Sequence, residues 1–276
     1  MIEFKKGDYF LITINPFSVL SETVPAIAMQ TFVIAMGLLV FLGTLLDVIH
    51  KKNVKYFFEN AKKAKKSAKK TLSTGEKTAV VIKTIAYDVA TTSELGAGKR
   101  RAAHLLGMYG TILFWIGSVI MIFCYASPSS DTPSVWPIIW HVGAIMTILG
   151  GFWFWFFLRV DVYSEAHPWY RIIKADLFVL ALLSSATFGL IWSYLQSLNL
   201  NNRWDDKLFF FLFVLSNIVL FGGVYWSKFA HMFYKPGAAI QKNLAEADGS
   251  RDNMPPPADA PEKFGLGIKR EAPKHY

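Results

Sequence analysis

The stretch VPAIAMQTFVIAMGLLVFLGTLLDVI, Val24–Ile49, contains a single ionisable residue, Asp47. A bilayer's hydrocarbon core of about 30 Å needs roughly 20 helical residues, so the stretch is long enough to cross it. Lipid offers no partner for open backbone groups, and a segment that crosses it must therefore be helical. This stretch alone predicts a membrane protein and argues against a water-soluble domain.

Four more apolar stretches of similar length follow. Only 18% of the 276 residues are charged and 53% are hydrophobic, whereas about a quarter of a typical soluble domain is charged. The predicted fold class is therefore all-α, an integral membrane bundle of five transmembrane helices. These helices are expected at Val24–Ile49, Ala103–Tyr125, Val135–Leu158, Ile172–Leu195 and Leu208–Phe229.

The charged residues gather between the predicted helices. Residues 51–102 carry fourteen lysines and arginines against four acidic residues, while the loop SPSSDTPS after the second helix has no basic residue. The positive-inside rule then places the N-terminus outside and the C-terminus in the cytoplasm. We expect an outside segment 1–23, a membrane domain 24–234 with the basic cytoplasmic loop 51–102, and an irregular cytoplasmic tail 235–276. The localisation expected is the inner (cytoplasmic) membrane, crossed several times.

The basic loop shows helical patterns of its own. Residues Val54–Leu72 predict an amphipathic helix, and Ala79–Val89 predict a second, short helix. The lysine pairs of the first suit anionic lipid headgroups or, alternatively, an acidic cytoplasmic protein. No nucleic-acid partner is expected for a stretch tethered to a membrane. The MPPPADAP run at Met254–Pro261 is incompatible with a regular helix.

The sequence excludes several kinds of chemistry. A single cysteine, Cys124, rules out cysteine-ligated iron–sulfur clusters and a covalently attached haem c. The chain has no phosphate-binding loop, nucleophile motif or half-helix repeat, so catalysis on a small soluble substrate and transport both lack visible machinery.

Two of the six histidines are placed as a pair. His104 lies near the inner end of the second predicted helix, and His231 near the inner end of the fifth. Antiparallel helices bring such residues to one depth, where two imidazoles can ligate a single haem iron axially. Arg100 and Arg101 are placed to pair with haem propionates. The alternative is that both histidines simply reach the membrane surface.

Other residues near these histidines allow more than one interpretation. Glycines near the histidine pair suit either a flat macrocycle or close helix packing. His50 is a substitute ligand or an interfacial residue, and His141 suits a quinone site or a polar pocket. Asp176 is expected to pair with Lys174 at the interface. The glycines in question are Gly107, Gly110, Gly222 and Gly223.

Two motifs carry a family resemblance. The stretches IAYDVATTSELGAGKRRAAHLLGMYG, Ile85–Gly110, and WSKFAHMFYKP, Trp226–Pro236, resemble the nitrate reductase gamma-like membrane cytochromes. They are most similar to the membrane subunit of the quinone-interacting oxidoreductase complex and to membrane anchors associated with adenylylsulfate reductase. The resemblance implies a haem b with His104 and His231 as axial ligands, a quinone as electron partner, and a cytoplasmic flavin/iron–sulfur oxidoreductase docked on the basic face.

The departures from that family limit what is expected. The chain lacks the cysteine-rich ferredoxin domain of the quinone-interacting complex subunit. The nitrate reductase gamma subunit carries two histidines on each of two helices, whereas this chain has one on each, which implies a single haem on the cytoplasmic side. Two functions stay open: an electron-transfer subunit, or a haem-free structural anchor for the same enzyme.

Overall fold

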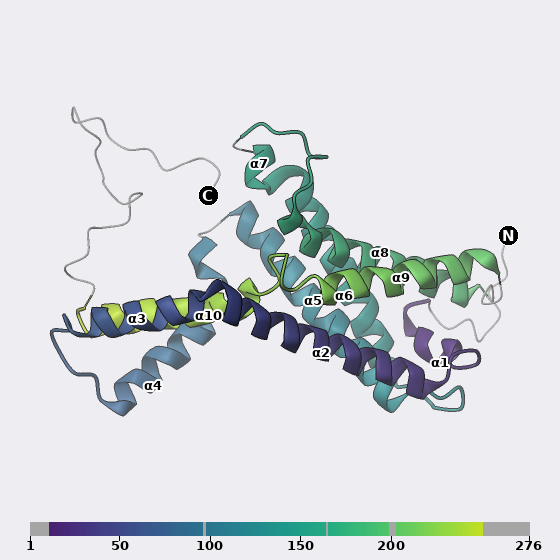
Figure 1. The fold of residues 1–276 in the computed structure, drawn as a ribbon. Helices are drawn as coiled ribbons and strands as arrows, with labels where there is room; N and C mark the ends of the chain where they lie inside the picture. The colour runs from purple at the N-terminus through teal and green to yellow at the C-terminus, as the bar shows by residue number, and fades with distance from the viewer. Residues whose placement is uncertain (1–10, 96–97, 164, 199–202, 251–276) are drawn as a thin grey trace. The chain divides into compact units, whose positions relative to one another are not determined.

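The computed structural model describes residues 11–95, 98–163, 165–198 and 203–250. Within these residues all regular structure is helical and no strand occurs (Figure 1). The all-α class predicted from the sequence is thereby confirmed.

In the described part of the chain four helices are long and apolar enough to cross a membrane, and they match the first four predicted stretches to within a few residues. Their apolar windows hold few charges because the basic residues lie at or beyond the helix ends. They are α2 (Ala26–Lys51), α5 (Lys99–Cys124), α6 (Val135–Trp153) extended by η4 (Phe154–Leu158), and α8 (Leu177–Ser197) preceded by η5 (Lys174–Asp176).

The fifth predicted helix differs from the structure. Helix α9 spans Trp204–Gly222, so the prediction of a helix over Leu208–Phe229 is wrong beyond Gly222. Two adjacent glycines disfavour helix at that point, and the amide of Gly223 closes α9 by donating to the carbonyl of Val219 at 2.9 Å. Three charged residues open α9, which leaves residues 208–222, about 22 Å of helix, for the apolar part.

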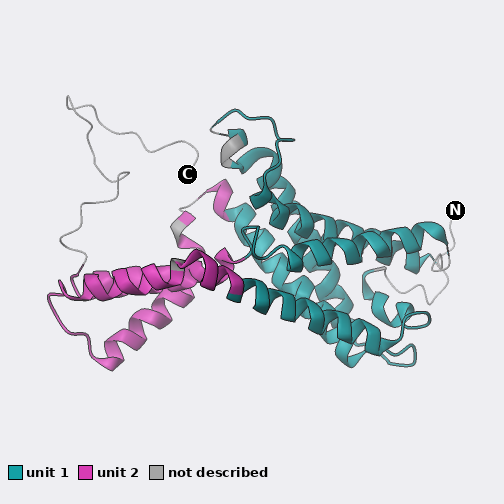
Figure 2. Cartoon of the chain, in the orientation of Figure 1, with its two compact units in different colours: residues 1–45, 102–229 teal, residues 46–101, 230–276 magenta. Residues whose placement is uncertain are grey.

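The described chain forms two compact units (Figure 2). Unit 1 takes residues up to Leu45 and Ala102–Phe229, and unit 2 takes Leu46–Arg101 and the residues from Ala230 onward. Besides the membrane-length helices, unit 1 contains η1 (Leu11–Thr13), α1 (Pro16–Leu20) and α7 (Val160–Tyr163).

Large aromatic side chains form the core of unit 1, where α8 packs along α9 and against α6 (Figure 1). Trp192 of α8 stacks on Phe213 of α9 with ring centroids 5.7 Å apart. Phe17 of α1 meets Trp140 and Trp192 edge-on. Such aromatic contacts add to the packing energy by about 0.5–1.5 kcal/mol each.

Glycines let α5 and α6 approach backbone to backbone. A Cβ on Gly110 would lie 2.5 Å from the amide nitrogen of Thr147 and 2.8 Å from the carbonyl oxygen of Gly143. A Cβ on Gly150 would lie 2.5 Å from the amide nitrogen of Gly107. Small residues at these positions are what membrane helices use to pack closely.

Unit 2 is built from three further helices and two short helical turns. Helix α10 contacts α3, α4 and η2, and Ser73 caps α4 reciprocally with Glu76. The two helices predicted in the basic loop are present with shifted bounds, since the first ends at Lys65 and the second begins at Thr74. The elements are α3 (Asn53–Lys65), α4 (Thr74–Lys83), η2 (Thr84–Val89), η3 (Ser93–Leu95) and α10 (His231–Ala247).

Helix α10 corrects the prediction of an irregular tail from Lys235, which is wrong as far as Ala247. Pro236 and Gly237 disfavour helix locally. Packing on α4 and η2, with Ala239 buried, outweighs that preference. The Met254–Pro261 run lies outside the described residues.

Candidate functional site

The two histidines predicted as a pair belong to different units. His104 is on α5 in unit 1, one turn after the basic start of that helix, and its side chain is exposed. His231 is also exposed, but it begins α10 of unit 2 and does not lie on α9 as predicted. The helix break after Gly222 accounts for this shift.

Some of the surroundings of His104 fit a flat ligand and some do not. A Cβ on Gly107 would meet nothing within 4 Å, and the same holds for Gly222. The space beside Gly110 is occupied by α6, and a Cβ on Gly223 would meet the carbonyl of Val219 at 2.6 Å. An exposed imidazole beside the open face of Gly107 therefore fits a haem, while Gly110 serves helix packing.

The predicted propionate partners open the same helix. Arg100 is partly exposed, and the Nε of Arg101 donates to the carbonyl of Thr91 at 2.7 Å within unit 2. That bond fixes the Arg101 side chain near the start of α5. No group of three or more His, Cys, Asp or Glu side chains suited to a bare metal ion occurs among the described residues.

Both ring nitrogens of His141 form hydrogen bonds with other residues of unit 1. Its Nδ1 lies 2.7 Å from the carbonyl of Pro137, and its Nε2 lies 2.9 Å from the hydroxyl of Ser193. A carbonyl can only accept, so Nδ1 carries the proton and Nε2 accepts from Ser193. With 2% of its surface exposed, His141 ties α6 to α8, which supports the polar-pocket interpretation over a quinone site.

Asp176 pairs with Arg159, a partner that the sequence did not indicate. The guanidinium lies 3.0 Å from the carboxylate, donates to the carbonyl of Arg171 at 2.8 Å, and sits 4.1 Å from the ring centre of Trp155. The expected pairing of Asp176 with Lys174 is replaced by this buried ion pair. Seventeen residues separate Arg159 from Asp176 in the chain, and no local pattern connects them.

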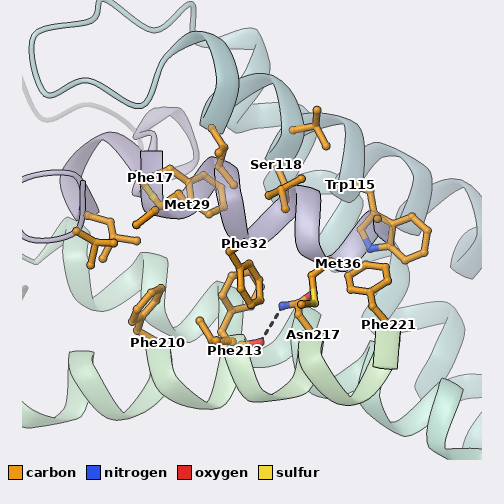
Figure 3. Close-up of a pocket in the computed structure, with 18 of the residues that line it drawn as sticks. Phe17, Met29, Phe32, Met36, Trp115, Ser118, Phe210, Phe213, Asn217 and Phe221 are labelled. Atoms are coloured by element: carbon orange, nitrogen blue, oxygen red, sulfur yellow. Dashed lines mark hydrogen bonds between the residues drawn. The ribbon is translucent and has the colours of Figure 1, made fainter. Parts of the chain in front are cut away.

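Unit 1 also encloses a half-open cavity of about 430 Å³, which the sequence analysis missed (Figure 3). Its walls come from α1, α2, α5 and α9, and the lining residues include no charged side chain. Helix α1 is held in place by Asn15, which accepts from the amide of Phe17 at 3.0 Å and donates to the carbonyl of Tyr125 at 2.9 Å. Phe17 thereby closes one end of the cavity.

Three polar side chains line this cavity. Ser118 has no donor left for a ligand, because its hydroxyl donates to the carbonyl of Phe114 at 2.9 Å; it also accepts from the indole of Trp140 at 2.8 Å. Asn217 donates to the carbonyl of Phe213 at 2.8 Å and accepts from Ser185. The Nε1 of Trp115 is buried and has no hydrogen-bond partner among the described residues. Asn217 lies inside the apolar run LSNIVLF, and this polar residue is the signal that could have indicated the site.

Unit 2 contains two polar anchors for α10. The Tyr234 hydroxyl donates to Asp47 at 3.0 Å, and burial first, then this bond, raises the pKa of Tyr234 to about 12. The amide of Asn243 donates to Asp88 at 2.6 Å and to Thr84 at 2.8 Å. Bonds from Ser93 and then Asn243 hold the pKa of Asp88 below its ordinary value.

Comparisons with protein-family models, with curated proteins and with solved structures give no match to this chain. The assignment that stands on the structure is therefore an all-helical protein with four helices apolar enough to cross a membrane.

Proposed function

We propose that this chain is a membrane anchor and electron-transfer subunit that links the quinone pool to a cytoplasmic flavin/iron–sulfur oxidoreductase through one haem b. Adenylylsulfate reductase is the enzyme that the resemblance implies. The observation that carries the proposal is the setting of His104, exposed on an apolar membrane-length helix, next to the open face of Gly107 and one turn from Arg100 and Arg101. This setting supplies an axial ligand, room for a macrocycle and cations for its propionates.

The proposed topology has five crossings, with the N-terminus outside and the C-terminus in the cytoplasm. Helix α9 is the fifth, and its short apolar part is accommodated by local thinning of the bilayer, at fractions of a kcal/mol per Å. The concentration of lysines in residues 51–102 supports a cytoplasmic unit 2. The membrane is the inner (cytoplasmic) membrane.

In this proposal His104 and His231 would hold the haem iron, and Arg100 and Arg101 would pair with the propionates. A haem b supplies a one-electron carrier between a two-electron quinone and the soluble enzyme. Exposed lysines of α3 provide the docking surface for an acidic face of that enzyme. Three of them, Lys62, Lys63 and Lys65, have no ion pair among the described residues, and neither has Lys66 directly after the helix.

A haem-free structural anchor is the second candidate, and one observation favours it. Gly110 lies between one and two turns along α5 from His104. The space beside it is filled by α6, so a macrocycle cannot lie against this glycine. In that case the helices and the basic unit tether the enzyme, and all redox chemistry belongs to the partner.

The test is a dithionite-reduced minus oxidised absorbance spectrum of detergent-purified chain expressed with ample haem, with haem counted as pyridine haemochrome. The proposal expects a b-type spectrum near one haem per chain, lost in His104→Ala and in His231→Ala. His167→Ala lies in the exposed loop, where its one ion pair among the described residues is with Glu165; this variant is the control and should keep its haem. A flat spectrum from folded protein would overturn the haem and leave the structural anchor.

A further inference from the structure

We propose that the cavity of unit 1 binds one uncharged, carbonyl-bearing molecule with a hydrocarbon chain, taken from the bilayer, and that Trp115 and Asn217 donate hydrogen bonds to its carbonyl oxygen. The proposal deepens the proposed function where the molecule is a quinone, but the binding itself requires neither haem nor a partner enzyme.

The walls of the cavity determine the charge and polarity of the ligand. The lining consists of aliphatic and aromatic side chains apart from Trp115, Ser118 and Asn217. An ionised group placed there would lose its hydration without a counter-ion, which excludes a phosphate or carboxylate. The volume of about 430 Å³ falls within the range of small-molecule pockets. An uncharged molecule that is apolar over most of its surface fits this space.

The polar groups of the cavity determine which functional group the ligand must carry. The buried Nε1 of Trp115 can only donate, and leaving it without an acceptor costs free energy. Asn217, with 7% of its surface exposed, carries two amide hydrogens and donates to one carbonyl, that of Phe213. Figure 3 shows the indole nitrogen of Trp115 on the side of its ring toward Met36, and the amide nitrogen of Asn217 joined to the carbonyl of Phe213 by its one hydrogen bond there. Two donors in an apolar cavity select an acceptor, and a carbonyl oxygen has two lone pairs to accept both.

The position of α2 provides the route of access. One face of α2 lines the cavity through Met29, Phe32 and Met36. Its other face is exposed and apolar, with Ile34 and Phe41 55% and 64% exposed. In a membrane-spanning helix that face meets lipid, so a molecule dissolved in the bilayer reaches the half-open cavity sideways. Two classes of bilayer molecule carry such a carbonyl: quinones and the acyl esters of neutral glycerides.

Gly37 allows the cavity to be filled without disturbing the fold. It lines the cavity, and a Cβ there would meet nothing within 4 Å. Leucine at this position occupies the space and favours helix over glycine. Gly75 of α4 is equally open and lies outside the lining residues, so Gly75→Leu is the matched control.

The experiment measures binding of tritium-labelled decylubiquinone to the full, detergent-purified chain by scintillation proximity, with unlabelled dioleoylglycerol as competitor. The expected result is saturable binding near one per chain, weakened at least tenfold by Gly37→Leu and unchanged by Gly75→Leu. Trp115→Phe and Asn217→Leu should each weaken binding about tenfold, which corresponds to one lost hydrogen bond. The effect of each variant is measured as decylubiquinone binding, so the result does not depend on whether the chain holds haem.

The competitor distinguishes the two sources. Strong binding of decylubiquinone with weak competition identifies a quinone site, whereas full displacement at lower glyceride concentration identifies a neutral lipid site, and either supports the proposal. Absence of saturable decylubiquinone binding would overturn it, as would binding that Gly37→Leu leaves unchanged. If the absorbance spectrum shows no haem but decylubiquinone still binds, the haem proposal is refuted and the proposal of a ligand in the cavity stands.

Discussion

The guanidinium of Arg159 lies 3.0 Å from the carboxylate of Asp176, and both side chains are buried. Arg159 follows the third membrane-length helix and Asp176 directly precedes the fourth. The same carboxylate accepts from the amide of Ile173 at 3.0 Å. The ion pair therefore closes the loop between two helices of unit 1.

Breaking this pair should destabilise unit 1 strongly. Arg159→Met leaves the Asp176 charge buried, and the loss of one partner of a buried pair costs about 3 kcal/mol or more. The measurement is thermal unfolding in detergent followed by intrinsic fluorescence. The control is Arg203→Met, which removes an ion pair of the same length that is exposed on the arginine side and should cost below about 1 kcal/mol. Equal effects of the two variants would contradict the structural role of the buried pair.

Glycine substitutions should separate helix packing from ligand space on α5. Gly110→Leu forces a side chain into the backbone of α6, where a Cβ already lies 2.5 Å from the amide of Thr147, and should abolish a folded monodisperse protein. Gly107→Leu meets open space and should leave the unfolding temperature within a few degrees of the parent. If haem is bound against Gly107, this variant should lower haem content while the protein stays folded. A folded, stable Gly110→Leu protein would disprove the close approach of α5 and α6.

His141 should contribute to stability and leave haem content unchanged. His141→Leu removes both ring hydrogen bonds and leaves the hydroxyl of Ser193 buried without its imidazole partner, at a cost of about 1–3 kcal/mol. Ser193→Ala should be milder, and the double variant should cost less than the sum of the two single variants, because they share one hydrogen bond. The unfolding temperatures of the two single variants and the double variant, compared with the parent, complete this double-mutant cycle. Loss of haem in folded His141→Leu would mean that His141 is a ligand.

The bond between Asn243 and Asp88 should make the stability of unit 2 depend on pH. The pKa of Asp88 is lower in the folded chain than its ordinary value of about 3.9. Its stabilisation is therefore present above the unfolded-state pKa and is lost as pH falls through the folded-state pKa. Asn243→Ala should cost about 1 kcal/mol near pH 7, and the part due to Asp88 should disappear at lower pH.

Hydrogen exchange of the 231–247 peptides at pH 7 and at about pH 2, well below the ordinary pKa of an aspartate, provides the measurement, since it reports opening of α10 directly. Gln241→Ala on the same helix is the control and should exchange like the parent chain. A cost of Asn243→Ala that stays the same at both pH values would assign the effect to the Thr84 bond alone.

The sequence predicted the helical class and four membrane-length helices because each depends on local properties. Apolar length and the position of charges decide whether a segment such as Val135–Leu158 can cross a bilayer, and both are read directly along the chain. The fifth helix was predicted too far because hydrophobicity continues past Gly222 and Gly223. The backbone turns there, and His231 consequently falls on α10.

Contacts between distant segments were decided by the tertiary structure alone. Asp176 pairs with the distant Arg159 and not with the nearby Lys174, and α10 stays helical through Pro236 because α4 and η2 cover it. The cavity beside Trp115 depends on how α1, α2, α5 and α9 meet. Periodicity and charge fix which segments are helical and which are apolar. The pairing of side chains and the space left between helices follow from packing, which no single segment determines.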